Sequence, residues 1–113
     1  MSERLLRLVC LEDLEDPGSK GFFVEWRGEE LQGLVVQQDA QIFAYVNRCP
    51  HTGAPLDWMP DQFLDSESSY IQCAVHGALF EIDSGRCVYG PCVNQYLQRL
   101  QVEVADGGVY LKQ

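Results

Sequence analysis

The two histidines of the chain each lie shortly after a cysteine. His51 ends the stretch CPH, which begins at Cys49, and His76 ends the stretch CAVH, which begins at Cys73. Both pairs stand among residues that favour turns. Cysteine thiolates and histidine imidazoles are ligands that zinc and iron bind in proteins. The repeated pair predicts one metal centre held by two loops, so the chain has to fold in a way that brings these loops together.

The rest of the sequence predicts short β-strands and no helix. Near the C-terminus, Leu100, Val102 and Val104 alternate with polar residues, and the turn ADGG follows, which is typical of a half-buried antiparallel hairpin. Strands separated by such short polar turns indicate an all-β fold, a small antiparallel sandwich or barrel. The predicted strands are residues 4–10, 22–26, 31–38, 41–46, 78–82, 86–90, 100–104 and 109–112.

The length of 113 residues predicts a single domain, residues 1–113, with one β base. Residues 47–92 interrupt the regular strands and are richer in Gly, Pro and Cys. We therefore expect this stretch to form a loop-built subdomain that holds the metal and is mounted on the β base.

The cysteine content and the net charge indicate in which cellular compartment the protein works and which kinds of partner it can bind. The start of the chain, MSERLLRLVC, is too short and too charged for a signal peptide, so we expect a cytoplasmic protein whose five cysteines serve metal or redox chemistry. A formal net charge of −9 argues against nucleic acid and anionic membranes as partners and favours a basic protein surface. The same charge also serves simply to keep a small protein in solution.

Two metal centres fit two cysteines and two histidines. A structural zinc site accepts this ligand set, but zinc fingers group two Cys and then two His, with the histidines on a helix. Here the order is Cys, His, Cys, His without a helix signal. A [2Fe-2S] cluster in which one iron takes two Cys and the other takes two His uses the same ligands.

The spacing of the two Cys and His motifs and the residues that flank them distinguish between these metal centres. CPH, followed 21 residues later by CAVHG, resembles the two ligand motifs of Rieske iron-sulfur proteins, and the flanks AYVN and ALFEIDSGRCVYGP are also similar to that family. The resemblance implies a Rieske-like fold and one [2Fe-2S] cluster. Cys49 and Cys73 would bind the inner iron, and His51 and His76 the outer iron.

The resemblance also implies a function. With two thiolates and two neutral imidazoles the oxidised centre is near neutral and accepts one electron. We expect a ferredoxin, an electron-transport component of an oxidoreductase system rather than a catalyst, that passes electrons from a reductase to a terminal oxidoreductase such as an oxygenase. Two alternatives stay open: a small subunit of an assimilatory nitrite reductase, and a zinc-stabilised interaction module.

The sequence departs from other Rieske proteins at several positions. Rieske proteins of cytochrome bc complexes carry a disulfide between the two loops, but Ala54 and Ala74 stand at the corresponding places. Ala78 and Phe80 stand where high-potential members have a Ser and a Tyr that donate hydrogen bonds to sulfur. This predicts a low reduction potential.

Other side chains have two interpretations each. Trp58, Met59 and Phe63, in the long loop DWMPDQFLDSESS, either form a contact patch or, as we favour, cover the core of the subdomain. For Cys87 and Cys92 we favour two buried thiols over a redox-active bridge. Cys10 is predicted to lie in the core.

Overall fold

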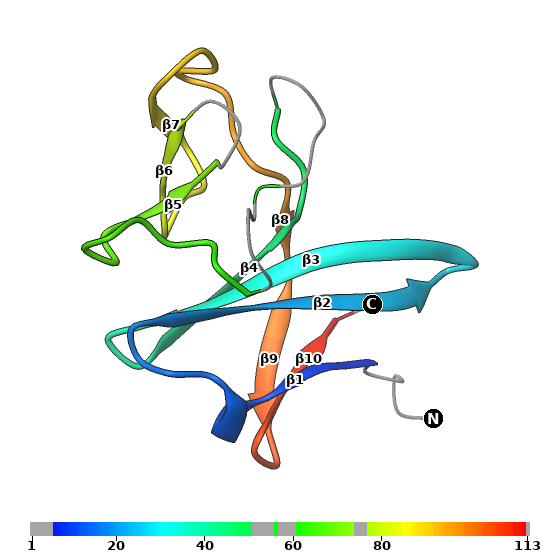
Figure 1. Ribbon diagram of the computed structural model, residues 1–113. Helices are drawn as coiled ribbons and strands as arrows, with labels where there is room; N and C mark the ends of the chain where they lie inside the picture. The colour runs from blue at the N-terminus through cyan, green and yellow to red at the C-terminus, as the bar shows by residue number, and fades with distance from the viewer. Residues whose placement is uncertain (1–5, 51–55, 57–60, 74–76, 113) are drawn as a thin grey trace.

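The computed structural model describes residues 6–50, 56, 61–73 and 77–112, and within these ranges the chain is almost entirely β-strand (Figure 1). The one helical segment described is a short 3-10 turn, Leu11–Asp13. The strands are β1 (Leu6–Cys10), β2 (Gly18–Trp26), β3 (Glu29–Gln38), β4 (Gln41–Val46), β5 (Tyr70–Gln72), β6 (Leu79–Glu81), β7 (Cys87–Tyr89), β8 (Arg99–Leu100), β9 (Val102–Ala105) and β10 (Gly108–Leu111).

The described strands form three antiparallel sheets. The central sheet has the order β2-β3-β4-β8, a second sheet has the order β1-β10-β9, and a third, smaller sheet has the order β5-β6-β7. Figure 1 shows the β5-β6-β7 sheet on one side of β2 and β3, and β1, β9 and β10 on the other. The prediction of an all-β antiparallel fold is confirmed. No helix in the described part of the chain has the length and apolar character needed to cross a membrane.

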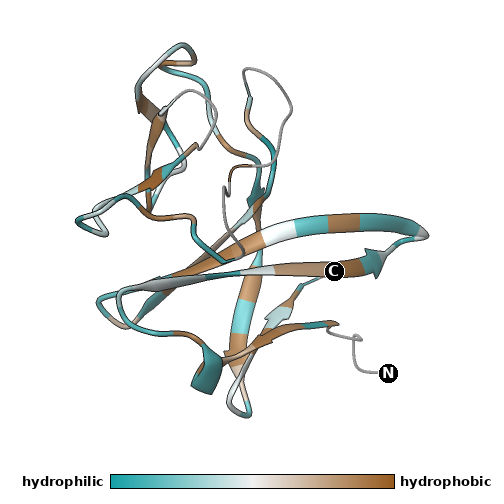
Figure 2. Cartoon of the chain, in the orientation of Figure 1, coloured by the Kyte–Doolittle hydropathy of each residue, from teal (hydrophilic) through white to brown (hydrophobic). Residues whose placement is uncertain are grey.

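Strand β3 separates two hydrophobic cores. Leu34 and Val36 pack with Tyr45 in the core that also contains the β5-β6-β7 sheet, whereas Val35 packs with Ala44 in the core of the β base. Successive side chains of a strand point to opposite faces, so an unbroken apolar run is buried on both sides. Figure 2 shows this run as the continuous brown stretch in the second half of β3. The central sheet therefore supports the small sheet on one face and closes the base with the other.

The C-terminal hairpin forms as predicted, and Leu100 is buried and Val102 partly buried in the core of the base, but Val104 is not. Strands β9 and β10 pair antiparallel across a turn in which Asp106 and Gly107 have φ angles of 49° and 73°. Val104 is 49% exposed, while Val109 and Leu111 of β10 are buried in the core of the base. Val104 is exposed because β9 lies at the edge of its sheet. Strand β10 lies between β1 and β9, in the middle of that sheet, and supplies the core residues.

Three other details of the prediction need correction. Strand β2 begins at Gly18, before the predicted residue 22, because the whole stretch pairs with β3 through Gly18 opposite Gln37. Strand β5 was not predicted; its pairing with β6 defines it. Cys10 is partly buried and lies outside the buried core.

Tyr45 joins the base to the small sheet. Its hydroxyl group donates a buried hydrogen bond of 2.7 Å to the carbonyl oxygen of Ile82. Gly85 follows in the DSG turn with a φ angle of +75°, and a Cβ atom there would lie 2.8 Å from the Tyr45 ring. Glycine alone combines this backbone conformation with this close approach. The tyrosine ring and the turn therefore fix how the two sheets sit against each other.

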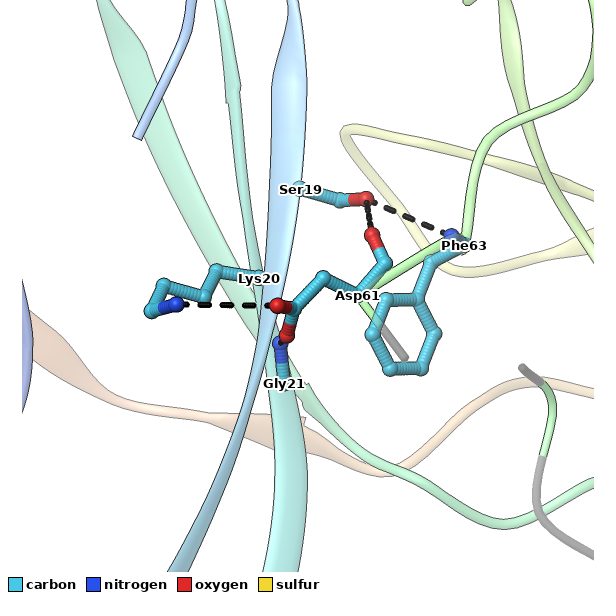
Figure 3. Close-up of polar contacts among 5 residues, drawn as sticks. All are labelled: Ser19, Lys20, Gly21, Asp61 and Phe63. Carbon is cyan, nitrogen blue, oxygen red and sulfur yellow. Dashed lines mark hydrogen bonds and ion pairs between the residues drawn. The ribbon is translucent and has the colours of Figure 1, made fainter. Parts of the chain in front are cut away.

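A second joint lies at the edge of the central sheet, where residues 61–63 run along β2 (Figure 3). The Asp61 Oδ1 atom accepts a hydrogen bond of 2.8 Å from the backbone N–H of Gly21, and Lys20 forms an ion pair with the same carboxylate. Ser19 Oγ donates to the Asp61 carbonyl oxygen and accepts from Phe63 N. Because β2 is an edge strand, these contacts satisfy backbone groups that would otherwise face solvent.

Candidate metal centre

The structure brings the two predicted cysteine ligands into one core. Cys49 lies three residues after β4 and Cys73 follows β5 directly, yet both thiols are buried in the same hydrophobic cluster and neither forms a disulfide. Figure 1 shows that the segment after β4 and the small sheet lie at the same end of the molecule, away from β1, β9 and β10. His51 and His76, the two predicted histidine ligands, lie outside the described residues.

Asn47 closes the loop that carries Cys49. Its Oδ1 atom accepts a hydrogen bond of 2.7 Å from the backbone N–H of Leu56, nine residues later, and its own N–H donates to the Gln32 carbonyl oxygen at 2.9 Å. Leu56 is buried in the same cluster as the two cysteines. Asn47 was not among the residues predicted to shape the site. The signal was its position at the start of a Gly- and Pro-containing loop, where an Asn side chain commonly bonds nearby backbone.

Backbone hydrogen bonds close the loop that follows Cys73. The Cys73 N–H donates to the Ala78 carbonyl oxygen at 2.8 Å, and the Gly77 N–H donates to the Cys73 carbonyl oxygen at 2.9 Å. Gly77 has a φ angle of +66°, a left-handed conformation that favours glycine. The loop is therefore tied to itself at both of its described ends, which holds the Cys73 thiol in a defined place.

A third segment, residues 86–96, packs against both loops. It contains β7, Pro91 and the buried residues Cys87 and Cys92. Gly90 lies so close to the second loop that a Cβ atom on it would lie 2.9 Å from the Cα atom of Ala78. The segment is closed by hydrogen bonds from Asn94 N to the Cys87 carbonyl oxygen and from Gln95 N to the Cys92 carbonyl oxygen.

Cys87 and Cys92 are buried thiols, as the favoured interpretation predicted. Their Sγ atoms lie 3.2 Å apart, in a hydrogen bond from Cys92 to Cys87, and both are free cysteines. Burial raises the pKa of the Cys92 thiol to about 12, and smaller contributions come from Cys87 and from a side-chain hydrogen bond with Cys49. Cys92 therefore keeps its proton at neutral pH. Its contact with Cys49 was not foreseen from the sequence.

Phe63 of the long loop covers the core. This side chain is 1% exposed and packs in the same cluster as Cys49 and Cys73, which agrees with the favoured interpretation. Trp58 and Met59 lie outside the described residues, as do Ala54 and Ala74, so the prediction of a missing disulfide at the last two positions stays a prediction.

The amino-acid sequence matches one known protein family. A family model described as the Rieske [2Fe-2S] domain matches residues 8–105. The chain belongs to the Rieske family. The match covers the central sheet, the small sheet and all three segments described above, so the predicted resemblance is confirmed. No sequence in a search of curated proteins matches this Rieske chain.

Solved structures share the whole architecture. The ferredoxin of carbazole 1,9a-dioxygenase from Nocardioides aromaticivorans IC177 is 25% identical, with a TM-score of 0.75 over 96% of this chain and 97% of that chain. A Sphingomonas yanoikuyae B1 ferredoxin is 24% identical, with a TM-score of 0.75 over 97% and 99% of the two chains, and shows the fold. So does the terminal oxygenase of carbazole 1,9a-dioxygenase from Novosphingobium sp. KA1, at 20% identity and a TM-score of 0.76 over 96% of this chain and 29% of that one.

The donor atoms in the described part of the chain suit the cluster that defines the family. A Rieske domain binds one [2Fe-2S] cluster, and two thiolate ligands are what such a cluster takes from cysteine. Cys49 and Cys73 provide two thiols on separate loops, buried in one apolar cluster and not engaged in disulfides. Apolar surroundings disfavour a bare thiolate, so two such thiols together suit a positively charged iron centre.

Proposed function

We propose that this Rieske protein is a ferredoxin that carries single electrons from a reductase to a terminal oxygenase. The observation that carries the proposal is the match to the Nocardioides ferredoxin of carbazole 1,9a-dioxygenase, which extends over almost the whole of both chains. Matched oxygenase structures resemble this chain over less than a third of their own length. Other matched structures are complexes of oxygenase and ferredoxin in carbazole 1,9a-dioxygenase, which supports an oxygenase as the electron acceptor.

The proposed ligands are Cys49 and Cys73 for one iron and His51 and His76 for the other. When bound, the cluster accepts and returns one electron. The two cysteine thiolates neutralise the charge of the oxidised centre, and neutral imidazoles keep it from becoming as negative as a four-cysteine site. The burial of both thiols excludes water from the sulfur atoms, and the closed loops hold them in place while the charge changes.

The surface beside Cys92 supports docking of a protein partner. Tyr89, Val93 and Tyr96 are 64%, 48% and 59% exposed, and all three lie in the segment that carries the buried Cys92, which contacts Cys49. Exposed apolar side chains that gather on one segment are typical of interaction sites. The chain as a whole carries a formal charge of −9. A partner with a basic rim around an apolar centre suits this combination.

Metal content and electron transfer test the proposal. The purified protein is expected to contain about two irons and two acid-labile sulfides per chain. His51→Ala and His76→Ala are each expected to abolish the iron-sulfur absorption spectrum. One zinc and no iron would instead favour the zinc-stabilised interaction module.

The partner is tested by mixing the chemically reduced protein with an oxidised ring-hydroxylating oxygenase and following reoxidation by stopped-flow absorbance. Tyr96→Ala is expected to slow this reaction without changing the reduction potential. Phe23→Ala is the matched control, because Phe23 is 58% exposed but lies in β2 of the central sheet. Transfer to a nitrite reductase and not to an oxygenase would contradict the proposal.

A further inference from the structure

The two segments that carry the cysteine ligands are closed by different groups. The segment after Cys73 is closed by two backbone hydrogen bonds of Cys73 itself, one from its N–H and one to its carbonyl oxygen. The segment after Cys49 is closed by a side chain, because Asn47 Oδ1 accepts the hydrogen bond of 2.7 Å from the Leu56 N–H. One side-chain substitution can therefore loosen the first ligand segment and leave the second one closed.

Asn47 lies where the first ligand segment leaves the central sheet. Its backbone N–H donates to the Gln32 carbonyl oxygen of β3 at 2.9 Å, and the Val46 N–H donates to the Gln98 carbonyl oxygen at 2.9 Å. The main chain at this point is therefore held from two sides, and Cys49 follows two residues after Asn47. Asn47 thus has a fixed backbone from which its side chain can hold the far end of the segment.

The hydrogen bond from the Leu56 N–H lies at a buried position. The Leu56 side chain is 0% exposed and packs in the same hydrophobic cluster as Cys49, which is 1% exposed. A buried N–H group without an acceptor gives up its hydration and gains no bond in return. Without the Asn47 acceptor, the closed form would carry this cost and an open, hydrated form would not. The bond therefore favours the closed form of the segment.

We propose that Asn47 is a positioning residue that slows the loss of the [2Fe-2S] cluster, because its side chain holds the Cys49 segment closed at Leu56. This inference rests on the proposed function, in which Cys49 is an iron ligand. A thiolate parts from iron only when its main chain can move away, and the Asn47 side chain opposes this movement. Replacing residues that support metal ligands in this way typically lowers metal affinity by roughly 10- to 100-fold.

The rate of iron release tests the inference. The cluster-loaded protein is mixed with an excess of an iron chelator, and the loss of its visible absorbance is followed under conditions in which the protein stays folded. Asn47→Ala is expected to release iron about tenfold faster than the unmodified protein, which corresponds to about 1.4 kcal/mol. Asn47→Asp keeps an oxygen acceptor for the Leu56 N–H and is expected to bring the rate back toward that of the unmodified protein.

Val109→Ala is the matched control for global stability. Val109 is 0% exposed but lies in the core of the β base, on the other face of the central sheet. The substitution is expected to lower the urea midpoint, because it leaves a cavity, and to leave the rate of iron release unchanged. If Asn47→Ala folds, as judged by far-UV circular dichroism, but takes up no cluster, the iron and labile-sulfide contents of the three variants replace the release rates in the comparison.

Hydrogen exchange tests the bond itself. The Leu56 amide is expected to be protected in the unmodified protein and in Asn47→Asp, and to exchange faster in Asn47→Ala. Mass spectrometry with fragmentation that resolves residue 56 measures this exchange and does not depend on the chelator.

Several outcomes would overturn the inference. They are an unchanged release rate in Asn47→Ala, an equally fast release in Val109→Ala, a release from Asn47→Asp as fast as that from Asn47→Ala, or a Leu56 amide that exchanges freely in the unmodified protein. Each of these leaves the proposed ferredoxin function intact. An unmodified protein without iron and labile sulfide would overturn both the function and this inference, so the two failures are distinguishable.

Discussion

Replacing Asp61 by Ala is expected to destabilise the protein strongly, because this carboxylate attaches the long loop to the β base. The side chain accepts the 2.8 Å hydrogen bond from the Gly21 N–H on the edge of β2 (Figure 3). A hydrogen bond to a charged group contributes about 1.5–3 kcal/mol. Asp61 also has a φ angle of 65°, a conformation that costs an ordinary residue about 1–2 kcal/mol and that Asp and Asn tolerate better. Together these terms predict a loss of about 2.5–5 kcal/mol in the free energy of unfolding.

Asp61→Asn is the matched control. The amide keeps an oxygen acceptor for Gly21 and tolerates the same backbone conformation, but it loses the 3.6 Å ion pair with Lys20. That pair is partly exposed, and such pairs contribute about 0.2–1 kcal/mol. The neutral hydrogen bond is weaker by about 1–1.5 kcal/mol, so together with the lost ion pair we expect Asp61→Asn to cost about 1.2–2.5 kcal/mol. Lys20→Ala, which removes only the ion pair, is expected to cost less than about 1 kcal/mol.

Urea denaturation measures all three variants, with far-UV circular dichroism for the strands and visible absorbance for the iron-sulfur centre. If Asp61→Ala and Asp61→Asn lose the same stability, the charge and not the backbone acceptor holds the loop, and the reasoning is wrong. A loss below about 0.5 kcal/mol in Asp61→Ala, within the range of ordinary surface changes, would show that residues 61–63 do not stabilise the edge of β2.

Three further predictions follow from the core and the surface. The reduction potential is expected to lie on the order of −150 mV. Voltammetry should show that Ala78→Ser and Phe80→Tyr each raise this potential, because each adds a hydrogen-bond donor. A strongly positive potential in the unmodified protein would refute the argument from missing hydroxyl groups. Burial raises the pKa of Tyr45 to about 12 from an ordinary value of about 10, so the stability that its phenol contributes is complete below pH 10 and is lost as the pH rises from 10 to 12. Tyr45→Phe should cost about 1–3 kcal/mol, because the Ile82 carbonyl oxygen loses its buried donor, and should flatten the pH dependence of the urea midpoint in that window. Electron transfer to the partner should slow as salt rises, because a formal charge of −9 steers a basic partner; a rate independent of ionic strength would point to apolar docking alone.

Short-range patterns in the sequence were enough to predict the fold class. Strand β4 begins and ends at the predicted residues, 41 and 46, because its apolar run lies between two polar turns. The β9-β10 turn forms at Asp106 and Gly107, since this dipeptide favours the left-handed conformations that a two-residue hairpin turn needs. The Cys and His spacing likewise led to the Rieske family, because a ligand motif is itself a local feature of the chain.

What the patterns could not predict depends on contacts between segments far apart in the sequence. Val104 alternates as a core residue does, yet it is exposed, because β10 and not β9 occupies the middle of its sheet. Strand β5 is defined by its pairing with β6, across the loop that follows Cys73.

Ligand type and spacing are properties of the chain, so the sequence alone shows which residues have the chemistry to hold a metal. What surrounds the Cys49 sulfur depends on the fold. The Asn47 side chain closes its loop, and Cys92 arrives beside it from a segment more than forty residues away in the sequence. The physical reason is that hydrogen bonds and burial act over a few ångströms in space, whatever the distance along the chain.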